Sequence, residues 1–124
     1  MKRRALVVDD DANNLMLEKD LLEVAGFEVF EAINALSGIA IAVKERPDVI
    51  VMDVRLPDMR GTEAAQILRQ DEVTQDIPIV FVTASVMAEG REDIEDMLAT
   101  TNSGFIGKPI NTRTFAKDIA KYIK

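Results

Sequence analysis

Carboxylates gather at the ends of two apolar runs in this sequence. The run Val49–Met52 ends on Asp53, and the run Ala5–Val8 ends on Asp9 and Asp10. Short continuous apolar runs are typical of strands that are buried on both faces of a parallel sheet. Such sheets bind their ligands at the carboxyl ends of the strands. We therefore expect Asp53 to lie where the chemistry of this protein takes place.

Three of these carboxylates would form a cation site. Asp9, Asp10 and Asp53 would repel one another if the fold brought them together, unless a cation shared them. Several hard oxygen ligands suit Mg²⁺, which keeps part of its water shell in proteins. Asp11 is expected instead to cap the following helix, where aspartate is favoured and the helix dipole stabilises it. The sequence thus predicts a magnesium site made by the other three aspartates.

A hydroxyl and an ammonium group follow two further apolar runs. Thr83 ends the run Ile79–Val82, and Lys108 comes shortly after Phe105–Ile106. An ammonium and a hydroxyl around a metal-bound aspartate can bind a phosphoryl group. Aspartate is also a known covalent acceptor of phosphoryl groups. We therefore expect Lys108 to neutralise the transferring oxygens at Asp53, and Thr83 to donate a hydrogen bond to the phosphate once it has formed.

Five strands that alternate with five helices would position these groups. The predicted strands are 4–8, 28–32, 49–52, 79–82 and 105–106. Short connections between such elements specify right-handed βαβ units and a parallel sheet covered on both faces. The natural assignment is the α/β flavodoxin-like (βα)5 fold with strand order 2-1-3-4-5. In that order the strand ends that bear Asp10 and Asp53 converge.

Each predicted helix has an apolar stripe that we expect to face the sheet. Glu18 falls near the middle of the first stripe, and the sequence gives no reason for it. Between the fourth stripe and the last strand we expect a polar loop at Thr100–Gly104. The stripes are Leu17, Leu21, Leu22 and Ala25 before Gly26; Leu36, Ile39, Ala40 and Val43 before Pro47; Ala64, Ile67 and Leu68 after Gly61; Ile94, Met97 and Leu98; and Phe115, Ile119, Tyr122 and Ile123.

Composition limits the class of protein. A chain of 124 residues with 48% apolar composition predicts one compact domain over 1–124. The formal net charge of −7 argues against direct binding to nucleic acid, which needs a basic footprint. The basic start of the chain precedes only four apolar residues, so we expect no targeting segment and no membrane partner. The absence of cysteine is compatible with the cytoplasm, where we expect the protein to act.

Four short motifs together resemble a known family. They are VVDDD at the first strand, MDVRLPDMRG around Asp53, VTAS at the fourth strand and FIGKPI at the fifth. Over essentially its whole length the sequence resembles a response-regulator receiver domain of two-component signalling. Single-domain regulators of the DivK type are the closest likeness. No one motif is specific, but their combination is.

The resemblance implies roles for the acidic residues. Asp53 would be the phosphoacceptor. Asp10 would bind Mg²⁺ directly, and Asp9 would do so partly through water. The backbone carbonyl of Arg55 would be a further ligand.

The resemblance also implies a switch. Thr83 would be the switch hydroxyl, and Phe105 would turn inward when Thr83 moves toward the phosphate. Lys108 would be the phosphate-binding cation, with a cis bond to the proline after it. Arg55 and Ser85 would flank the path of the attacking water and so modulate the lifetime of the acyl phosphate.

These roles imply a phosphorylation-dependent signalling switch and not an ordinary enzyme. The protein would accept a phosphoryl group from a histidine kinase or a histidine phosphotransfer protein, and would hydrolyse it slowly. Phosphorylation would change the face formed by the fourth helix, the fifth strand and the fifth helix. Because no output domain follows Lys124, the protein would act through a downstream target protein, as a monomer or a weak phosphorylation-dependent dimer. A dimer could pair an acidic fourth helix with the cations of the fifth, which are Arg113, Lys117, Lys121 and Lys124.

Other classes of protein share parts of the pattern. A receiver fold used as a phosphorylation-independent interaction module is the alternative that stays open. A haloacid dehalogenase-type phosphatase needs a second acid two positions beyond the nucleophile, where this chain has Arg55. A flavodoxin needs a hydroxyl-rich phosphate loop after the first strand, where this chain has three aspartates. The chain also has a few more residues between Thr83 and Lys108 than the receiver family commonly has, which affects the expected output face.

Overall fold

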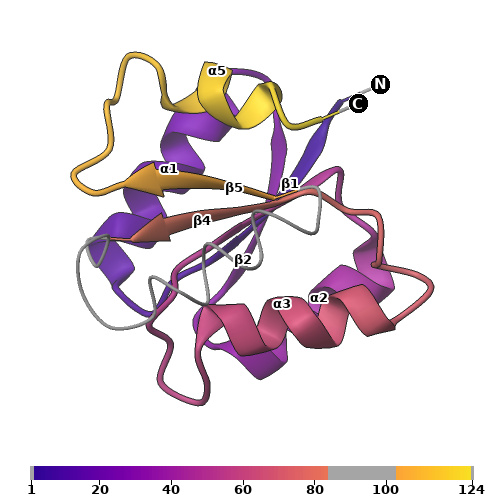
Figure 1. Cartoon of the computed structure of the whole chain (residues 1–124). Coiled ribbons are helices and arrows are strands. Elements are labelled where there is room, and N and C mark those ends of the chain that lie inside the picture. Colours follow the sequence, from indigo (N-terminus) through magenta and orange to yellow (C-terminus); the bar gives the residue numbers. More distant parts are fainter. Residues whose placement is uncertain (1, 84–102, 124) are drawn as a thin grey trace.

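A five-stranded parallel sheet forms the centre of the fold (Figure 1). The computed structural model describes residues 2–83 and 103–123. The strand order is β2-β1-β3-β4-β5, and every neighbouring pair is parallel. The predicted flavodoxin-like order is therefore confirmed. The strands are β1 Arg4–Val8, β2 Glu28–Ala32, β3 Val49–Met52, β4 Ile79–Thr83 and β5 Ser103–Gly107.

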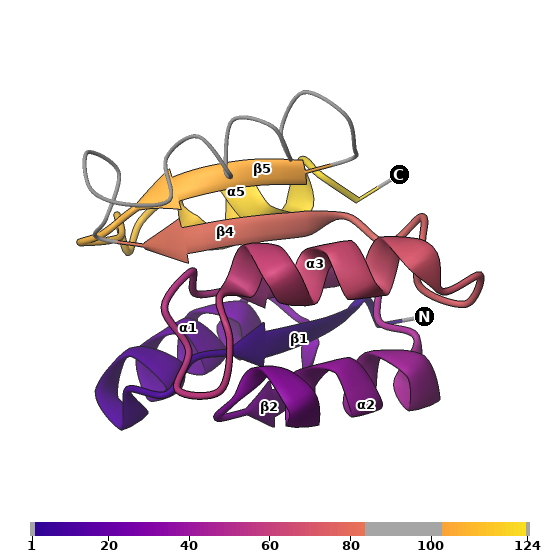
Figure 2. The same ribbon diagram turned by 60° about the horizontal axis from the view of Figure 1, so that its bottom comes forward.

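Helices cover both faces of the sheet. On one side lie α1 (Ala12–Val24) and α5 (Phe115–Ala120), and on the other lie α2 (Ala35–Glu45) and α3 (Gly61–Gln70). Figure 2 shows α2 and α3 side by side in front of the sheet. The predicted fourth helix, with Ile94, Met97 and Leu98, lies outside the described residues. Within the described ranges, no helix combines the length and the apolar character needed to cross a bilayer.

The sheet divides the core into two clusters. Alternate residues of a strand point to opposite faces, so Ile50 packs toward α2 and α3 while Val51 packs toward α1 and α5. Every residue of β3 is buried, as expected for a strand covered on both faces. β2 is an edge strand, and its exposed glutamates Glu28 and Glu31 are typical of a protected sheet edge.

The buried side of α1 and α2 differs from the predicted stripe, whereas Phe115 and Ile119 of α5 are buried as predicted. In α1 the buried residues are Leu15, Glu18 and Leu22, whereas Leu17 is 40% exposed. The α2 and α3 stripes are also partly wrong, because the sheet is approached by small residues. In α2, for example, a Cβ atom on Gly38 would lie 2.8 Å from a methyl carbon of Val8, so only glycine fits this contact. In α2 the buried residues are Ala35, Gly38 and Ala42 and Leu36 is exposed, and in α3 Ile67 is exposed beside buried Ala64, Ala65 and Leu68.

Strand β5 and helix α5 also differ from the prediction. β5 begins at Ser103, so Ser103 and Gly104 belong to a strand and not to a polar loop. They pair with Ile79 and Val80 through backbone hydrogen bonds, which do not require apolar side chains. The ring of Tyr122 lies where a side chain on residue 104 would project, which explains the glycine. Tyr122 itself follows α5, because the helix ends at Ala120.

Candidate functional site

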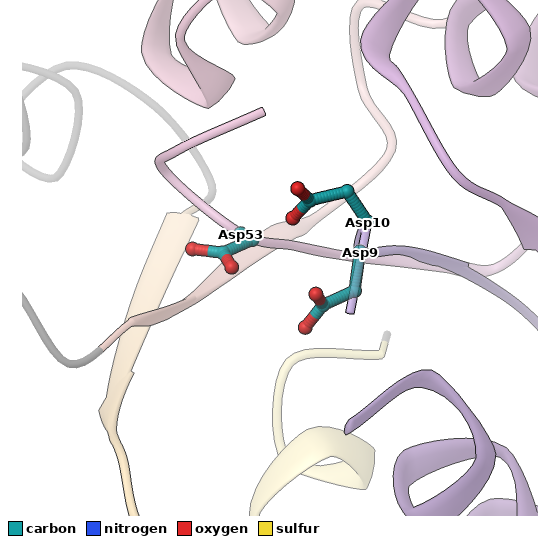
Figure 3. Close-up of side chains that lie close together, drawn as sticks. All are labelled: Asp9, Asp10 and Asp53. Carbon is teal, nitrogen blue, oxygen red and sulfur yellow. The ribbon is translucent and has the colours of Figure 1, made fainter. Parts of the chain in front are cut away.

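The sheet register brings the acidic residues together. Val8 at the end of β1 is paired with Met52 at the end of β3, so Asp9 and Asp53 are the next residues on neighbouring strands. The ladder continues one step further, since the Asp53 N–H donates to the Val8 carbonyl at 3.0 Å. Carboxylate oxygens of Asp9, Asp10 and Asp53 lie within 4.8 Å of one another (Figure 3). The predicted convergence of the three aspartates is confirmed.

The aspartates differ in exposure and in hydrogen bonding. Asp9 is 1% exposed, Asp53 is partly buried and Asp10 is exposed. Asp9 accepts the backbone N–H of Asp11 at 2.9 Å. The Asp11 side chain in turn accepts the N–H groups of Asn13 and Asn14 at 2.9 and 3.1 Å. Asp11 is therefore the N-cap of α1, as predicted.

Lys108 enters the cluster from the segment after β5. Its Nζ lies 3.1 Å from Asp9 Oδ2 and 3.1 Å from Asp53 Oδ2. Burial raises the pKa of Asp53 above its usual value, and the nearby ammonium offsets only part of this effect. Burial alone would lower the pKa of Lys108, but Asp53 and Asp9 outweigh it and raise that pKa. The Lys108–Pro109 peptide bond is cis, as the resemblance implied.

The loop after β3 closes back on Asp53. The backbone N–H of Arg55 donates to Asp53 Oδ1 at 3.3 Å, and Arg55 forms an antiparallel bridge with Arg60. Gly61 then donates its N–H to the Val54 carbonyl at 2.7 Å. A Cβ atom on Gly61 would collide with the backbone carbonyl oxygen of Asp53. Glycine thus allows α3 to begin directly against the predicted acceptor.

The predicted switch residues are only partly within the described structure. Thr83 is the last residue of β4 and pairs with Gly107, the residue before Lys108. The hydroxyl of Thr83 and the whole of Ser85 lie outside the described part of the chain. Phe105 pairs with Phe81 in the sheet and is partly buried against the cluster on the α2 and α3 side.

Glu18 is a fourth acid beside the site, and its role was not predicted. It is 3% exposed, and its Oε2 has no hydrogen-bond partner in the structure. Burial and the neighbouring Asp9 carboxylate raise the pKa of Glu18 to about 8, against an opposing effect of Lys108. A cavity of about 110 Å³ between α1 and the Lys108–Pro109 segment is lined by Glu18 together with Asn14 and Leu17. The signal was present in the sequence, as an acidic residue within an apolar stripe.

The donor set fits a hard divalent cation. Three carboxylates share one position, and only two of them are paired with Lys108. Such a group favours Mg²⁺, which binds carboxylates and retains water. An aspartate held between a cation site and a lysine can act as a nucleophile toward phosphorus, because both positive groups stabilise charge on the transferring oxygens.

The fold and the site together define a class of protein, a doubly wound α/β domain with an acidic cluster and a lysine at the carboxyl ends of its strands. Residues 5–120 match the model of the response regulator receiver domain, and the chain belongs to this family. It is thus a receiver domain of a two-component response regulator. Receiver domains are signalling switches that act with histidine kinases or phosphotransfer proteins and with downstream targets, and they bind Mg²⁺ at an acidic pocket.

Individual relatives agree with this assignment. The polar-differentiation response regulator DivK of Brucella anthropi is 32% identical over 123 residues, covering 99% of this chain and 98% of that protein. The chemotaxis response regulator CheY4 of Vibrio cholerae superposes with a TM-score of 0.87 at 28% identity, over 99% of this chain and 100% of that one. The receiver domain of the sensor histidine kinase PA1611 of Pseudomonas aeruginosa shares the fold, with a TM-score of 0.87 at 24% identity and 98% of each chain covered. In that protein a magnesium ion is coordinated in the active site cleft.

Proposed function

We propose that this chain, as a single receiver domain over residues 1–124, accepts a phosphoryl group on Asp53 and signals by changing a binding face. The observation that carries the proposal is the position of Lys108, whose Nζ is 3.1 Å from both Asp9 and Asp53. A lysine in this place neutralises the carboxylates while the site is free. It then binds the phosphoryl oxygens once they are attached to Asp53.

The transfer step uses one oxygen of Asp53 as the nucleophile. This oxygen forms a bond to the phosphorus of a phosphohistidine, the P–N bond breaks, and its electron pair leaves with the imidazole. The product is an acyl phosphate on Asp53, which water later hydrolyses to inorganic phosphate and the free carboxylate. The Arg55 N–H, at 3.3 Å from Asp53 Oδ1, helps to hold the carboxylate in one orientation.

A magnesium ion would be held by Asp9, Asp10 and Asp53, with the backbone carbonyl of Arg55 as a further ligand. When bound, it neutralises charge on the transferring oxygens. Asp9 is fixed for this task, since its Oδ1 accepts the Asp11 N–H and its Oδ2 accepts from Lys108.

The signalling step assigns roles to residues around the pocket. Thr83 would hydrogen-bond the phosphoryl group, and Phe105 would turn inward as Thr83 moves. This changes the face formed by the segment before β5, β5 itself and α5, to which a downstream protein or a second copy binds. Arg55, which is exposed, and Ser85 would flank the attacking water and set the lifetime of the acyl phosphate.

Labelling with acetyl phosphate tests the acceptor. In the presence of Mg²⁺ we expect mass spectrometry to find one added phosphoryl group on the wild-type chain and none on Asp53→Asn. Asp20→Asn, the same change at an exposed position of α1, should be labelled like wild type. Undiminished labelling of Asp53→Asn would refute the assignment of the acceptor. If a downstream partner bound wild type and Asp53→Asn equally well with and without acetyl phosphate, the chain would instead be a phosphorylation-independent interaction module.

A further inference from the structure

A second concave surface lies at the edge of the sheet opposite the phosphoryl site. This groove has a volume of about 610 Å³. It is lined by Arg3, which precedes β1, and by Phe27, which precedes β2, so it lies at the amino ends of the strands. Asp9 and Asp53 follow the carboxyl ends, and the five residues of β1 separate the two edges by about 17 Å. A ligand in this groove would therefore leave the phosphoryl pocket open.

The groove is built from the N-terminal arm, the α1–β2 turn and helix α5, and its floor consists of alanine, glycine and phenylalanine residues. The α1–β2 turn contributes Ala25, Gly26 and the almost fully buried Phe27, and α5 contributes Ala116 and Ala120. Gly26 has a φ of 98°, and no atom lies within 4 Å of the position that a Cβ atom would take there. The floor is therefore apolar and open, which suits a small hydrophobic side chain.

The rim of the groove is cationic. It carries Lys2 and Arg3 from the N-terminal arm and Lys117 from α5, and none of the described residues that line the groove has a carboxylate side chain. None of the three cations forms an ion pair within the described part of the chain. The rim is therefore positively charged although the protein has a net charge of −7, with 22 acidic and 15 basic residues. Lys117, one of the cations expected on the fifth helix, is thus part of this rim.

We propose that this groove binds a short acidic segment of a partner protein, with an apolar side chain on the alanine and phenylalanine floor and carboxylates facing the three cations. Charge complementarity selects the acidic character, because the rest of the chain would repel such a segment. The apolar floor favours a peptide over a simple anion, because only a peptide has an apolar side chain that can be buried there. The groove would tether the domain to a partner while Asp53 exchanges phosphate at the other edge.

A model peptide tests this proposal. The probe is a fluorescein-labelled peptide of alternating glutamate and leucine, compared with one in which every glutamate is glutamine. We expect fluorescence anisotropy to show binding of the glutamate peptide only, and this binding should weaken with added salt. Lys117→Glu should weaken it by roughly tenfold, since it replaces an attraction by a repulsion at the rim. Arg3→Glu should act in the same direction.

The matched control is Lys44→Glu, which makes the same charge change in the last turn of α2, on the other side of the sheet. It should leave peptide binding within about twofold of wild type, because Lys44 does not line the groove and the sheet lies between them (Figure 1). Equal weakening by Lys44→Glu and Lys117→Glu would overturn the proposal, as would equal binding of the glutamine peptide. Concentration-dependent self-association that Lys117→Glu abolishes would also overturn it, with a second copy as the occupant. Acetyl phosphate labelling of Asp53 should be normal in Lys117→Glu, so failure here is distinct from failure of the proposed function.

Discussion

At the residue scale, the buried carboxyl group of Glu18 beside the candidate site affects the stability of the folded state. Its carboxyl group is buried next to Asp9, and one of its oxygens has no hydrogen-bond partner. Its pKa rises from 4.5 to about 8, mainly because of burial. The folded state therefore holds the Glu18 proton more tightly than the unfolded state does. Stability from this group is complete below pH 4.5 and is lost as the pH rises to about 8, by an amount on the order of a few kcal/mol.

Glu18→Gln removes this titration and keeps the shape of the side chain. We expect the variant to lose less stability than wild type as the pH is raised from about 4.5 to about 8. Urea denaturation in metal-free buffer at several pH values measures the two slopes. Glu23→Gln, at an exposed position of the same helix, should keep the wild-type slope. If Glu18→Gln shows that slope too, Glu18 is not the group that titrates.

At the element scale, Asp58 joins the loop between β3 and α3 to the start of α2. Its two carboxylate oxygens accept the N–H groups of Ala35 and Leu36 at 2.8 and 2.9 Å, while Asn34 accepts that of Ser37 at 2.8 Å. Loss of water contact acts to raise the pKa of Asp58, but the amide groups outweigh it and the pKa is lowered. This contribution to stability is therefore present at neutral pH and is lost as the pH falls through the depressed pKa.

Asp58→Ala should lower the melting temperature and slow the labelling of Asp53 by acetyl phosphate, because the loop between β3 and α3 loses its anchor. Asp58→Asn, which keeps one acceptor oxygen, should restore part of both properties. Glu72→Ala, at an exposed position after α3, is the control. A labelling rate for Asp58→Ala equal to that of wild type would show that the loop holds Asp53 in place without this contact.

At the scale of the whole molecule, repulsion within the acidic cluster lowers the stability of the metal-free protein. At 4.8 Å and a surface-like effective dielectric, two carboxylates repel by about 3 kcal/mol before relaxation. Lys108 pairs with Asp9 and Asp53, but Asp10 has no ion pair in the described part of the chain. The carboxylates proposed to hold the metal ion thus work against the stability of the metal-free protein.

Millimolar Mg²⁺ should raise the melting temperature by mass action on the folded state. Asp10→Asn should raise it by roughly a few degrees without metal and abolish the Mg²⁺ response. Thermal melts monitored by circular dichroism, with Asp20→Asn as the control, measure both effects. A lower melting temperature of Asp10→Asn in metal-free buffer would mean that this carboxylate is a structural cap and not a magnesium ligand.

The strands, and the convergence of the aspartates that follow them, could be predicted from the sequence because both depend on local patterns. The run Val49–Met52 is apolar at every position, which is typical of a strand covered on both faces, and it is strand β3 in the structure. Once the strands alternate with helices, the strands are expected to run parallel. The residue after each strand, such as Asp9 or Asp53, must then lie at one edge.

Only the tertiary structure decided which side of α1 and of α2 faces the sheet. Leu17 and Leu36 were expected to be buried, but both are exposed, while Gly38 and Glu18 lie inside. Apolar residues occur on more than one side of these helices, so periodicity along the chain could not select the buried side. The selection comes from close packing, which places small residues where a helix backbone approaches a strand and turns Glu18 toward Asp9 and Lys108. Such contacts join segments that are far apart in the chain, so they cannot be predicted from a local sequence pattern.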